Sequence, residues 1–216
     1  MALQAQSDGI AAICATPHIR HEHDVRIPEL PARRAELAAA LTQAGCVTRV
    51  LPGGEVAVTA LDGLDDAELQ AVALGGSGRW ILLEPVPGPL GDELEAAVRQ
   101  LYARGFRALI AHPERHLVSD LVQRLARLVA GGALVQATAA FLTDEATRAG
   151  MLALARAGVI HVLGSDSHSS RAGRPVALAA AIAALDGIEP AASHLEWIAR
   201  TAPEAIVRGD ELTPPF

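Results

Sequence analysis

The chain has 216 residues, of which 50% are hydrophobic and 3% aromatic, and its formal net charge is −7. This length can bury one sizeable core, so we expect a single domain over residues 1–216. The acidic balance argues against a nucleic-acid-binding protein, whose surface would be basic. Two cysteines cannot form a disulfide framework.

The amino-terminal segment MALQAQSDGIAAICATPH has neither the positive leader nor the small-residue cleavage site of a signal peptide. The apolar runs of the chain are short and are interrupted by Gly, Pro or charge, so we expect no membrane span. These two features predict a cytoplasmic protein. Cys14 lies within an apolar run and is expected to be a small core residue.

Short apolar runs alternate with longer helical patterns. In chain order, the runs are GIAAICATPH, VTRVLPGGE, RWILLEP, RALIAHPE, GALVQATA and GVIHVLGSDSH. The helical patterns between them include residues 28–45, 92–105 and 119–132. Apolar strands that alternate with helices predict a parallel sheet covered by helices, and six such strands favour a (β/α) barrel. Residues 210–216 are expected to form a frayed tail.

Ionisable residues follow most of the predicted strands. The runs end in His18, Glu55, Glu84, His112, Asp166 and His168, and Arg115 and Arg174 lie nearby. Each residue alone is explained by a loop, cap or turn. In a parallel barrel, however, all strand carboxyl ends open onto one face, and that face carries the chemistry. The repeated pattern therefore predicts that these side chains share one site.

This set of residues has the chemistry of a metal site. Imidazoles and carboxylates without clustered cysteines suit Mn²⁺, Fe²⁺ or Zn²⁺. The set exceeds what one catalytic ion takes from a protein, so we expect a multinuclear site. Arginine side chains beside clustered metals suit an anionic substrate that carries phosphate. The sequence therefore predicts metal-assisted hydrolysis of a phosphate ester.

The ordered motifs ATPH, LPGGE, ILLEP, IAHPER and SDSH followed by RP resemble those of the PHP-type protein-tyrosine phosphatases. These are the CpsB/YwqE-like enzymes of bacterial capsule and exopolysaccharide control. The resemblance extends from Met1 to TAPEAIVRGDEL, which resembles the closing helix of the family. It implies a distorted seven-stranded (β/α) barrel, divalent ions with Mn²⁺ favoured over Fe or Zn, and up to three ions in the complete site. It also implies a phosphotyrosine protein as substrate, usually a bacterial tyrosine autokinase.

Carried over by motif, the resemblance implies a role for each residue. Glu55 would bridge the first and second ions, Glu84 and His112 would complete the second, Asp166 would bind the first, and His18 and His168 the third. Arg115 would hold the phosphate and stabilise the leaving phenolate, and Arg174 would do similar work. The nucleophile would be a hydroxide that bridges two ions, so no cysteine nucleophile is needed.

Other polar residues near these motifs have simpler expectations. Glu114 is expected to support a ligand or an arginine, and His116 to be a loop residue. His161 lies inside its strand and is expected to be structural. His21 and His23 are expected to lie in a solvated loop.

The sequence departs from the family pattern at its start. Family members begin with a strand that carries Asp-x-His-x-His, followed by a loop with an aspartate ligand, and this sequence has neither. We therefore expect a barrel without its first strand, whose first and third ion sites are only partly supplied. An internal methionine taken as the start, or a truncated chain, explains this better than natural shortening. Two alternatives to a metal-dependent protein-tyrosine phosphatase stay open: an impaired relative that acts as a binding or regulatory protein, and a small-molecule PHP phosphatase such as a histidinol phosphatase.

Overall fold

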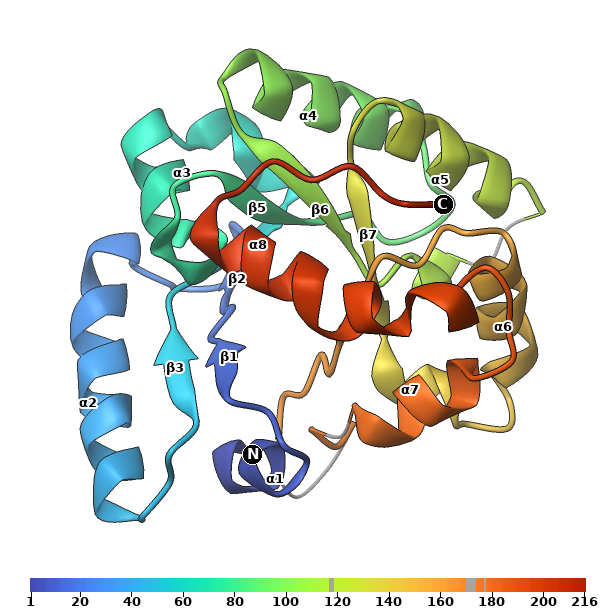
Figure 1. Cartoon of the computed structure of the whole chain (residues 1–216). Coiled ribbons are helices and arrows are strands. Elements are labelled where there is room, and N and C mark those ends of the chain that lie inside the picture. The colour runs from blue at the N-terminus through green and yellow to red at the C-terminus, as the bar shows by residue number, and fades with distance from the viewer. Residues whose placement is uncertain (117–118, 170–173, 177) are drawn as a thin grey trace.

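A computed structural model describes residues 1–116, 119–169, 174–176 and 178–216 (Figure 1). Its strands are β1 (Ala12–Cys14), β2 (His18–Ile19), β3 (Arg49–Leu51), β4 (Glu55–Ala57), β5 (Trp80–Glu84), β6 (Arg107–Ala111), β7 (Leu134–Thr138) and β8 (Val162–Gly164). Its α-helices are α1 (Ala2–Ser7), α2 (Leu30–Gln43), α3 (Asp66–Val72), α4 (Asp92–Ala103), α5 (Leu121–Ala130), α6 (Arg148–Arg156), α7 (Ala179–Leu185) and α8 (Ala202–Arg208). Short 3₁₀ helices are η1 (Ile27–Glu29), η2 (Val58–Gly63), η3 (Leu74–Gly76), η4 (Pro113–His116), η5 (Ala139–Leu142) and η6 (Ala192–His194), and a π-helical turn, η7 (Trp197–Thr201), leads into α8.

The strand pairs are parallel, as the alternation of strands and helices predicts. A six-stranded sheet has the order β2-β4-β5-β6-β7-β8, and β1 pairs with β3 in a two-stranded sheet. The first two apolar runs of the sequence each supply two short strands, because each run bends at a proline segment. Pairing continues through the bend, where the Glu55 N–H donates to the Pro17 carbonyl at 2.9 Å. The result is a mixed α/β fold built on parallel strands.

The three predicted helices are present as α2, α4 and α5. Gly45 and Gly105, which follow α2 and α4, have φ of +72° and +85°, a conformation that glycine adopts without steric cost. Helix α4 turns an apolar face to the core, whereas α2 buries none of its residues and lies at the outer edge beside β3 (Figure 1). No helix in the described part of the chain is long and apolar enough to cross a membrane.

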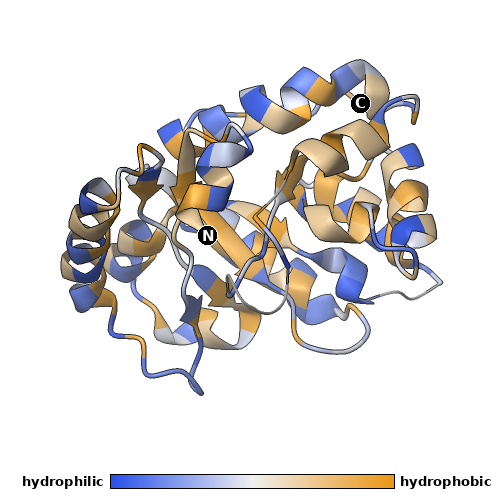
Figure 2. Ribbon diagram, turned by 90° about the horizontal axis from the view of Figure 1, so that it is seen from below, coloured by the Kyte–Doolittle hydropathy of each residue, from blue (hydrophilic) through white to orange (hydrophobic). Residues whose placement is uncertain are grey.

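The central strands carry apolar side chains on both faces, because helices cover both. Ile81 and Leu83 of β5 belong to the same apolar cluster as residues of α4 and α5, whereas Trp80 and Leu82 pack with residues of α8. This alternation has the two-residue period of a strand. Figure 2 shows hydrophobic residues along the central strands and hydrophilic residues spread over the helices and loops. The buried sheet therefore gives the strand ends a rigid base.

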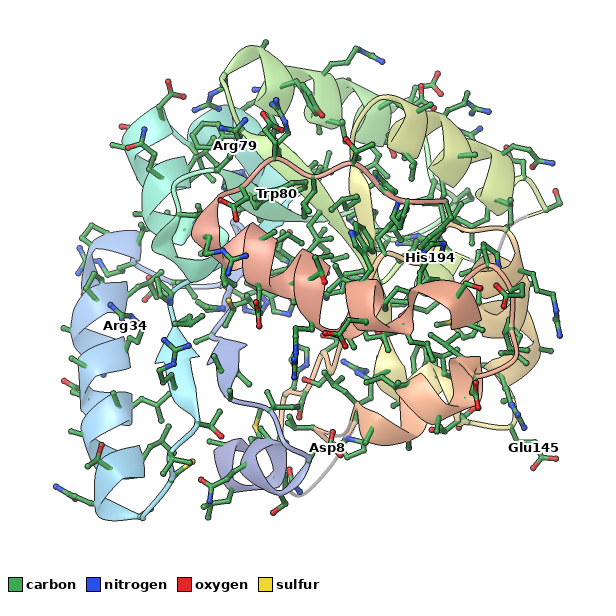
Figure 3. All side chains as sticks on the ribbon, viewed as in Figure 1. Asp8, Arg34, Arg79, Trp80, Glu145 and His194 are labelled. Carbon is green, nitrogen blue, oxygen red and sulfur yellow. The ribbon has the colours of Figure 1, made fainter. Side chains whose placement is uncertain are left out.

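The carboxyl-terminal tail, expected to be frayed, has no helix or strand but crosses the sheet near the start of β5 and β6 (Figure 1). The Trp80 indole N–H donates to the Asp210 carbonyl at 3.0 Å. Glu211 forms ion pairs with Arg79 and with Arg107, the latter at 2.8 Å. Figure 3 shows Arg79 and Trp80 beside this segment. These contacts connect the tail to the amino-terminal ends of the central strands.

The last residue of the tail belongs to an aromatic cluster. The Phe216 ring stacks on His161 and His194 at centroid distances of 5.7 and 4.9 Å. His161 is fully buried, and its Nδ1 accepts a hydrogen bond from the Val135 N–H at 3.2 Å. Burial lowers the pKa of His161 to about 4, so the imidazole is neutral in the folded protein near neutral pH. This environment agrees with the structural role expected for His161.

Candidate metal centre at the strand ends

The sequence-predicted site residues lie at the ends or bends of neighbouring strands. His18 and Glu55 begin β2 and β4, Glu84 ends β5, His112 follows β6, and Asp166 and His168 follow β8. The register pairs His18 with Glu55, because β2 and β4 are adjacent parallel strands. The strand pairing therefore places residues from distant parts of the sequence side by side at one rim of the sheet.

Glu55 lies at the centre of the group. Its Oε2 lies 2.8 Å from His18 Nδ1, and its Oε1 lies 2.9 Å from His112 Nε2. Glu55 is 4% exposed. Burial by itself raises the pKa of the Glu55 carboxyl, but the hydrogen bond and charge of His112, with the charges of His18 and Arg115, outweigh burial and lower it below its usual range. The carboxyl group is therefore held as an anion.

Glu84 extends this group toward the next strand. Its Oε2 lies 3.4 Å from His18 Nδ1, and its Oε1 lies 3.8 Å from His112 Nε2. One ligand atom from each of His18, Glu55 and Glu84 lies within 4.8 Å of the other two. This set differs from the grouping implied by the resemblance, in which His18 belongs to the third ion and Glu84 to the second.

The donor atoms fit a divalent ion. Among the described residues, His112 Nδ1 is buried without a hydrogen-bond partner, and the buried His18 Nδ1 lies near carboxylate oxygens of Glu55 and Glu84 without the geometry of a hydrogen bond. A buried polar atom without a partner is costly, and metal coordination is one way to satisfy an imidazole nitrogen. Carboxylate oxygens and imidazole nitrogens are ligands for Zn²⁺, Mn²⁺ and Fe²⁺. His18, Glu55 and Glu84 could together hold such an ion, and His112 Nε2 lies beside Glu55.

His168 brings β8 into the same site. Its Nε2 lies 3.2 Å from the Nε2 of His18. The His168 Nδ1 lies 3.0 Å from the Asp166 carbonyl oxygen, which orients the ring. The ring of His23 also stacks on that of His18, at a centroid distance of 5.2 Å. His23 is exposed, as expected for a loop residue, but it also contacts a candidate ligand.

Both predicted arginines converge on Asp166. Arg115 Nη2 forms an ion pair with Asp166 Oδ2, and Arg174 Nη2 lies 2.7 Å from the same oxygen. Arg174 Nε also donates to the Asp166 carbonyl oxygen at 2.9 Å. The Asp166 side chain is 7% exposed, so these pairs compensate a largely buried charge. The arginines therefore lie beside the candidate ligands, as the sequence predicts.

Two of the site residues have unusual backbone conformations. His112 and Asp166 have φ of +34° and +46°, and both are non-glycine residues. Positive φ is uncommon for such residues, costs about 1–3 kcal/mol and clusters at functional sites. In each case the unusual residue comes just after an apolar strand. The conformation helps to aim the side chain at the rim.

The glycine before Glu55 allows close packing under the site. A Cβ on Gly54 would lie 2.8 Å from Val72 Cβ, and Val72 is fully buried. Helix α3 can therefore approach the bend between β3 and β4 only if residue 54 has no side chain. The motif LPGGE thus has a packing role as well as a ligand role.

Sequence reasoning missed Arg20. Its Nε donates to Glu84 Oε2 at 2.8 Å, and its Nη2 pairs with Glu84 Oε1. Arg20 follows His18 by two positions at the end of β2, and residues two apart on an extended chain face the same side. That alternation is the sequence signal that could have found it.

Two neighbours of Arg115 differ from their expectations. Glu114 Oε1 accepts the Thr138 N–H at 2.9 Å, so this buried side chain contacts the end of β7 and no candidate ligand or arginine in the described contacts. His116 is buried at the end of η4, and its Nδ1 contacts the Gly88 carbonyl oxygen. These two contacts fix the segment after His112 to the end of β7 and to the segment around Gly88.

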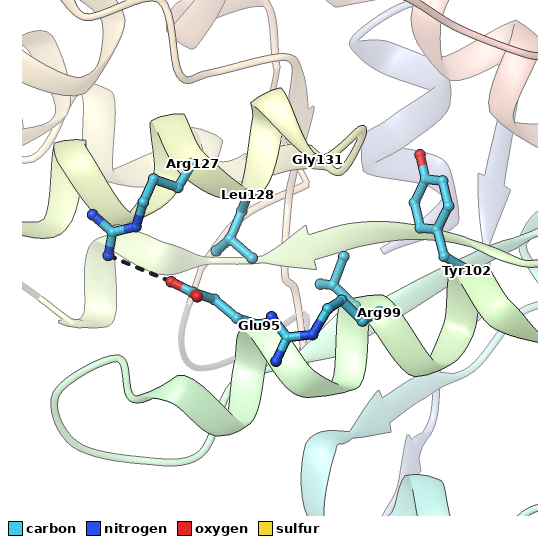
Figure 4. Close-up of a pocket in the computed structure, with 7 residues that line it drawn as sticks. Glu95, Arg99, Tyr102, Arg127, Leu128 and Gly131 are labelled. Carbon is cyan, nitrogen blue, oxygen red and sulfur yellow. Dashed lines mark hydrogen bonds and ion pairs between the residues drawn. The ribbon is translucent and has the colours of Figure 1, made fainter.

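Other potential sites lie away from the rim. A groove of about 380 Å³ between α4 and α5 is lined by residues that include Glu95, Tyr102 and Arg127, none of which belongs to the metal candidate set (Figure 4). Burial raises the pKa of the Cys14 thiol, although a hydrogen bond involving the Gly75 backbone offsets part of the effect. A raised pKa disfavours the reactive thiolate, so Cys14 has no features of an activated nucleophile.

Comparison with known proteins identifies the family. A chain from the study described as "Crystal structures of YwqE from Bacillus subtilis and CpsB from Streptococcus pneumoniae, unique metal-dependent tyrosine phosphatases" has a TM-score of 0.80 and 24% identity, over 97% of this chain and 85% of that one. At this identity the likeness shows a shared fold. Among curated protein sequences, none matches. The family model described as "Capsular polysaccharide synthesis, CpsB/CapC" matches residues 1–207, and the chain therefore belongs to the CpsB/CapC family.

Proposed function

We propose that this protein is a metal-dependent phosphatase that hydrolyses phosphotyrosine in proteins, in the control of capsule or exopolysaccharide synthesis. The observation that carries the proposal is the buried Glu55 carboxylate between His18 and His112, with Glu84 beside it, at the rim of a parallel sheet. The family match supports the capsule role, and the similar structure is described as that of metal-dependent tyrosine phosphatases. The proposed substrate is a bacterial tyrosine autokinase.

The proposed metal ligands are the six rim residues His18, Glu55, Glu84, His112, Asp166 and His168. The central position of Glu55, with one oxygen toward each of two histidines, supports its assignment as the bridging ligand. Mn²⁺ is the proposed ion. When bound, divalent ions would supply an activated water as nucleophile and neutralise charge on the phosphoryl group.

Arg115 and Arg174 are proposed to bind the phosphoryl oxygens. A guanidinium group presents planar, forked N–H donors that match phosphate oxygens. Both arginines are paired with Asp166 and are partly exposed, so they lie within reach of a ligand at the rim. Donors placed where charge develops stabilise the transition state, and Arg115 would do so at the departing phenolate oxygen.

We also propose that the single domain is a distorted seven-stranded barrel that lacks its first strand. In the described residues, β2 and β8 are the two ends of the larger sheet, and β1 has one strand partner. The contact between His18 and His168 links the two ends at the site. A chain extended upstream by a strand with Asp-x-His-x-His should protect the β8 amides from hydrogen exchange; unchanged exchange would contradict this arrangement.

The phosphatase proposal is tested by phosphate release from a phosphotyrosyl peptide. We expect hydrolysis with Mn²⁺ that EDTA abolishes and that added Mn²⁺ restores. A phosphoseryl peptide and histidinol phosphate serve as matched alternative substrates. Preference for histidinol phosphate would instead favour a small-molecule phosphatase.

The matched variants are Glu55→Gln, which removes the central charge, and Glu36→Gln, which removes an exposed carboxylate of α2. Only the first should lose metal-dependent hydrolysis. If the metal-loaded protein binds the phosphotyrosyl peptide without turnover at any pH, also when it is extended upstream by a strand with Asp-x-His-x-His, the phosphatase proposal is wrong and a binding role is favoured.

A further inference from the structure

Arg20 holds both oxygens of Glu84. The Arg20 Nε atom lies 2.8 Å from Glu84 Oε2, and its Nη2 atom pairs with Oε1, so the contact is bidentate. The Glu84 side chain is 4% exposed, whereas that of Arg20 is 25% exposed. A buried carboxylate needs a compensating partner, and a forked guanidinium is the strongest that a side chain can supply. Arg20 therefore compensates the charge of Glu84.

This contact uses the same oxygens that a metal ion would need. Glu84 belongs with His18 and Glu55 to the candidate ligand set. Its Oε2, which accepts from Arg20, is also the oxygen 3.4 Å from His18 Nδ1. A divalent cation and a guanidinium on one carboxylate repel each other strongly at such short range. The two cations therefore compete for Glu84.

We propose that Arg20 is a displaceable internal cation, which occupies Glu84 until a divalent ion binds and then turns toward the solvent-facing rim. Because part of its side chain is already exposed, Arg20 can leave Glu84 without opening the core. Once released, its guanidinium places a positive charge and several N–H donors at the rim, beside the site of an anionic substrate. Metal loading and the positive charge available to substrate are coupled through this one residue.

The inference rests on the proposed metal site, and it deepens that site by naming a residue that regulates its loading. Arg20 is a positioning residue, since it acts through Glu84. The coupling predicts opposite effects of one substitution. Removal of Arg20 should raise the affinity for the metal ion, because no cation has to be displaced from Glu84. It should lower the stability of the metal-free protein, because the buried Glu84 carboxylate loses its partner.

The experiment is calorimetric titration of metal-free protein with Mn²⁺, with thermal denaturation before and after loading. Arg20→Gln should bind Mn²⁺ about 10-fold more tightly than the parent protein, within the range of about 5- to 150-fold that is usual for coupled binding. Its metal-free form should melt at a lower temperature, and Mn²⁺ should narrow that difference. Arg20→Lys should bind Mn²⁺ with intermediate affinity, since lysine keeps the charge but not the fork.

The matched control is Arg26→Gln. Arg26 lies on the same segment of the chain and is exposed. Its one described ion pair is with Glu29, at 3.4 Å. The variant therefore loses the same charge as Arg20→Gln but leaves the contacts of Glu84 unchanged. Its Mn²⁺ affinity should equal that of the parent protein. Equal or weaker binding by Arg20→Gln would overturn the inference while leaving the metal site standing. If Arg20→Gln does not fold, Arg20→Lys decides, because binding no tighter than the parent's overturns the competition.

The outcome for the parent protein separates this inference from the proposed function. If neither the parent protein nor Arg26→Gln binds Mn²⁺, Fe²⁺ or Zn²⁺, the metal site itself is wrong and the competition falls with it. If the parent protein binds an ion and Arg20→Gln binds it with the same affinity, only the proposed role of Arg20 is wrong.

Discussion

The Nε2 atoms of His18 and His168 lie 3.2 Å apart, although 150 residues separate them in the sequence. His18 lies at one end of the six-stranded sheet and His168 follows the strand at the other end. Two imidazoles can face each other in this way when one nitrogen donates and the other accepts, or when both bind a metal ion. This relationship links the two ends of the sheet through the candidate site.

Replacement of His168 by alanine should separate function from stability. The His168 side chain is 55% exposed, so its loss should change the free energy of unfolding by no more than about 0.5 kcal/mol. Metal-dependent turnover should fall at least about 10-fold, since even groups that only support a ligand have effects of that size. His194→Ala, which lies away from the rim, is the control and should keep full turnover. Equal turnover of both variants would remove His168 from the site.

Arg115→Ala should lower kcat/KM for a phosphotyrosyl peptide about 10²–10³-fold, the usual effect of removing one donor to developing charge. Arg115→Lys should not restore the rate, because lysine has no planar fork. Steady-state kinetics give kcat, and the inhibition constant of inorganic phosphate reports anion binding, so the two effects of the substitution can be separated. Arg124→Ala, whose parent side chain pairs with exposed Asp120, is the control. A wild-type rate for Arg115→Ala would contradict the phosphate-binding role.

Gly54→Ala should destabilise the protein by about 1–3 kcal/mol, the usual range for overpacking a core. The added Cβ would lie 2.8 Å from Val72 Cβ, which is fixed to the backbone of α3 and cannot turn away. Urea denaturation measures the effect, and Mn²⁺ affinity should fall as Glu55 shifts. In Gly63→Ala the new Cβ would have only His21 Cε1 nearby, at 3.9 Å, so this control should be nearly neutral. Equal stability of the two variants would show that α3 adjusts freely.

His161 should make stability depend on pH. Its pKa is about 4 in the folded protein, below the ordinary value of 6.5, so the unfolded chain binds its proton first as the pH falls. The stability that neutral His161 contributes is complete above about pH 6.5 and is lost progressively down to about pH 4. Between pH 7 and pH 5 the loss should be about 2 kcal/mol.

The measurement for His161 is urea denaturation at both pH values for the parent protein and for His161→Asn. Asparagine keeps an acceptor for the Val135 N–H but does not titrate. The variant should therefore be less stable overall because it loses ring packing, yet show a smaller loss of stability between the two pH values. Identical pH slopes would mean that His161 remains unprotonated in both states or becomes protonated in both.

Removal of residues 210–216 should lower stability even though this tail has no helix or strand. Trp80 is fully buried and would lose the acceptor for its indole N–H, which costs about 1–3 kcal/mol. Loss of Phe216 would also expose one face of His161. Thermal denaturation and tryptophan fluorescence measure the change. The control variant Thr213→Ala, at an exposed position of the tail, should behave as the full chain. Unchanged stability of the truncated chain would support the expectation of a frayed end.

The candidate site shows how far local sequence reasoning extends. His18, Glu55, Glu84 and His112 could be found because each begins, ends or follows an apolar strand, and parallel strands place such positions at one rim. Arg20 was missed because it stands between the end of β2 and a polar loop, although its two-residue spacing from His18 could have placed it on the same side. Its partner, Glu84, lies 64 residues away, so no local pattern reveals the pair.

The sequence by itself determined the parallel α/β fold, the alternation of apolar strands with helices, and the family, because hydrophobic periodicity and ordered motifs are local properties of the chain. Only the tertiary structure decided which charges pair: His18 with His168, both arginines with Asp166, and Arg20 with Glu84. It also decided that the tail contacts Trp80 and His161. The physical reason is that such contacts depend on distances between residues far apart in sequence, and these distances are set by how the whole sheet and its helices pack.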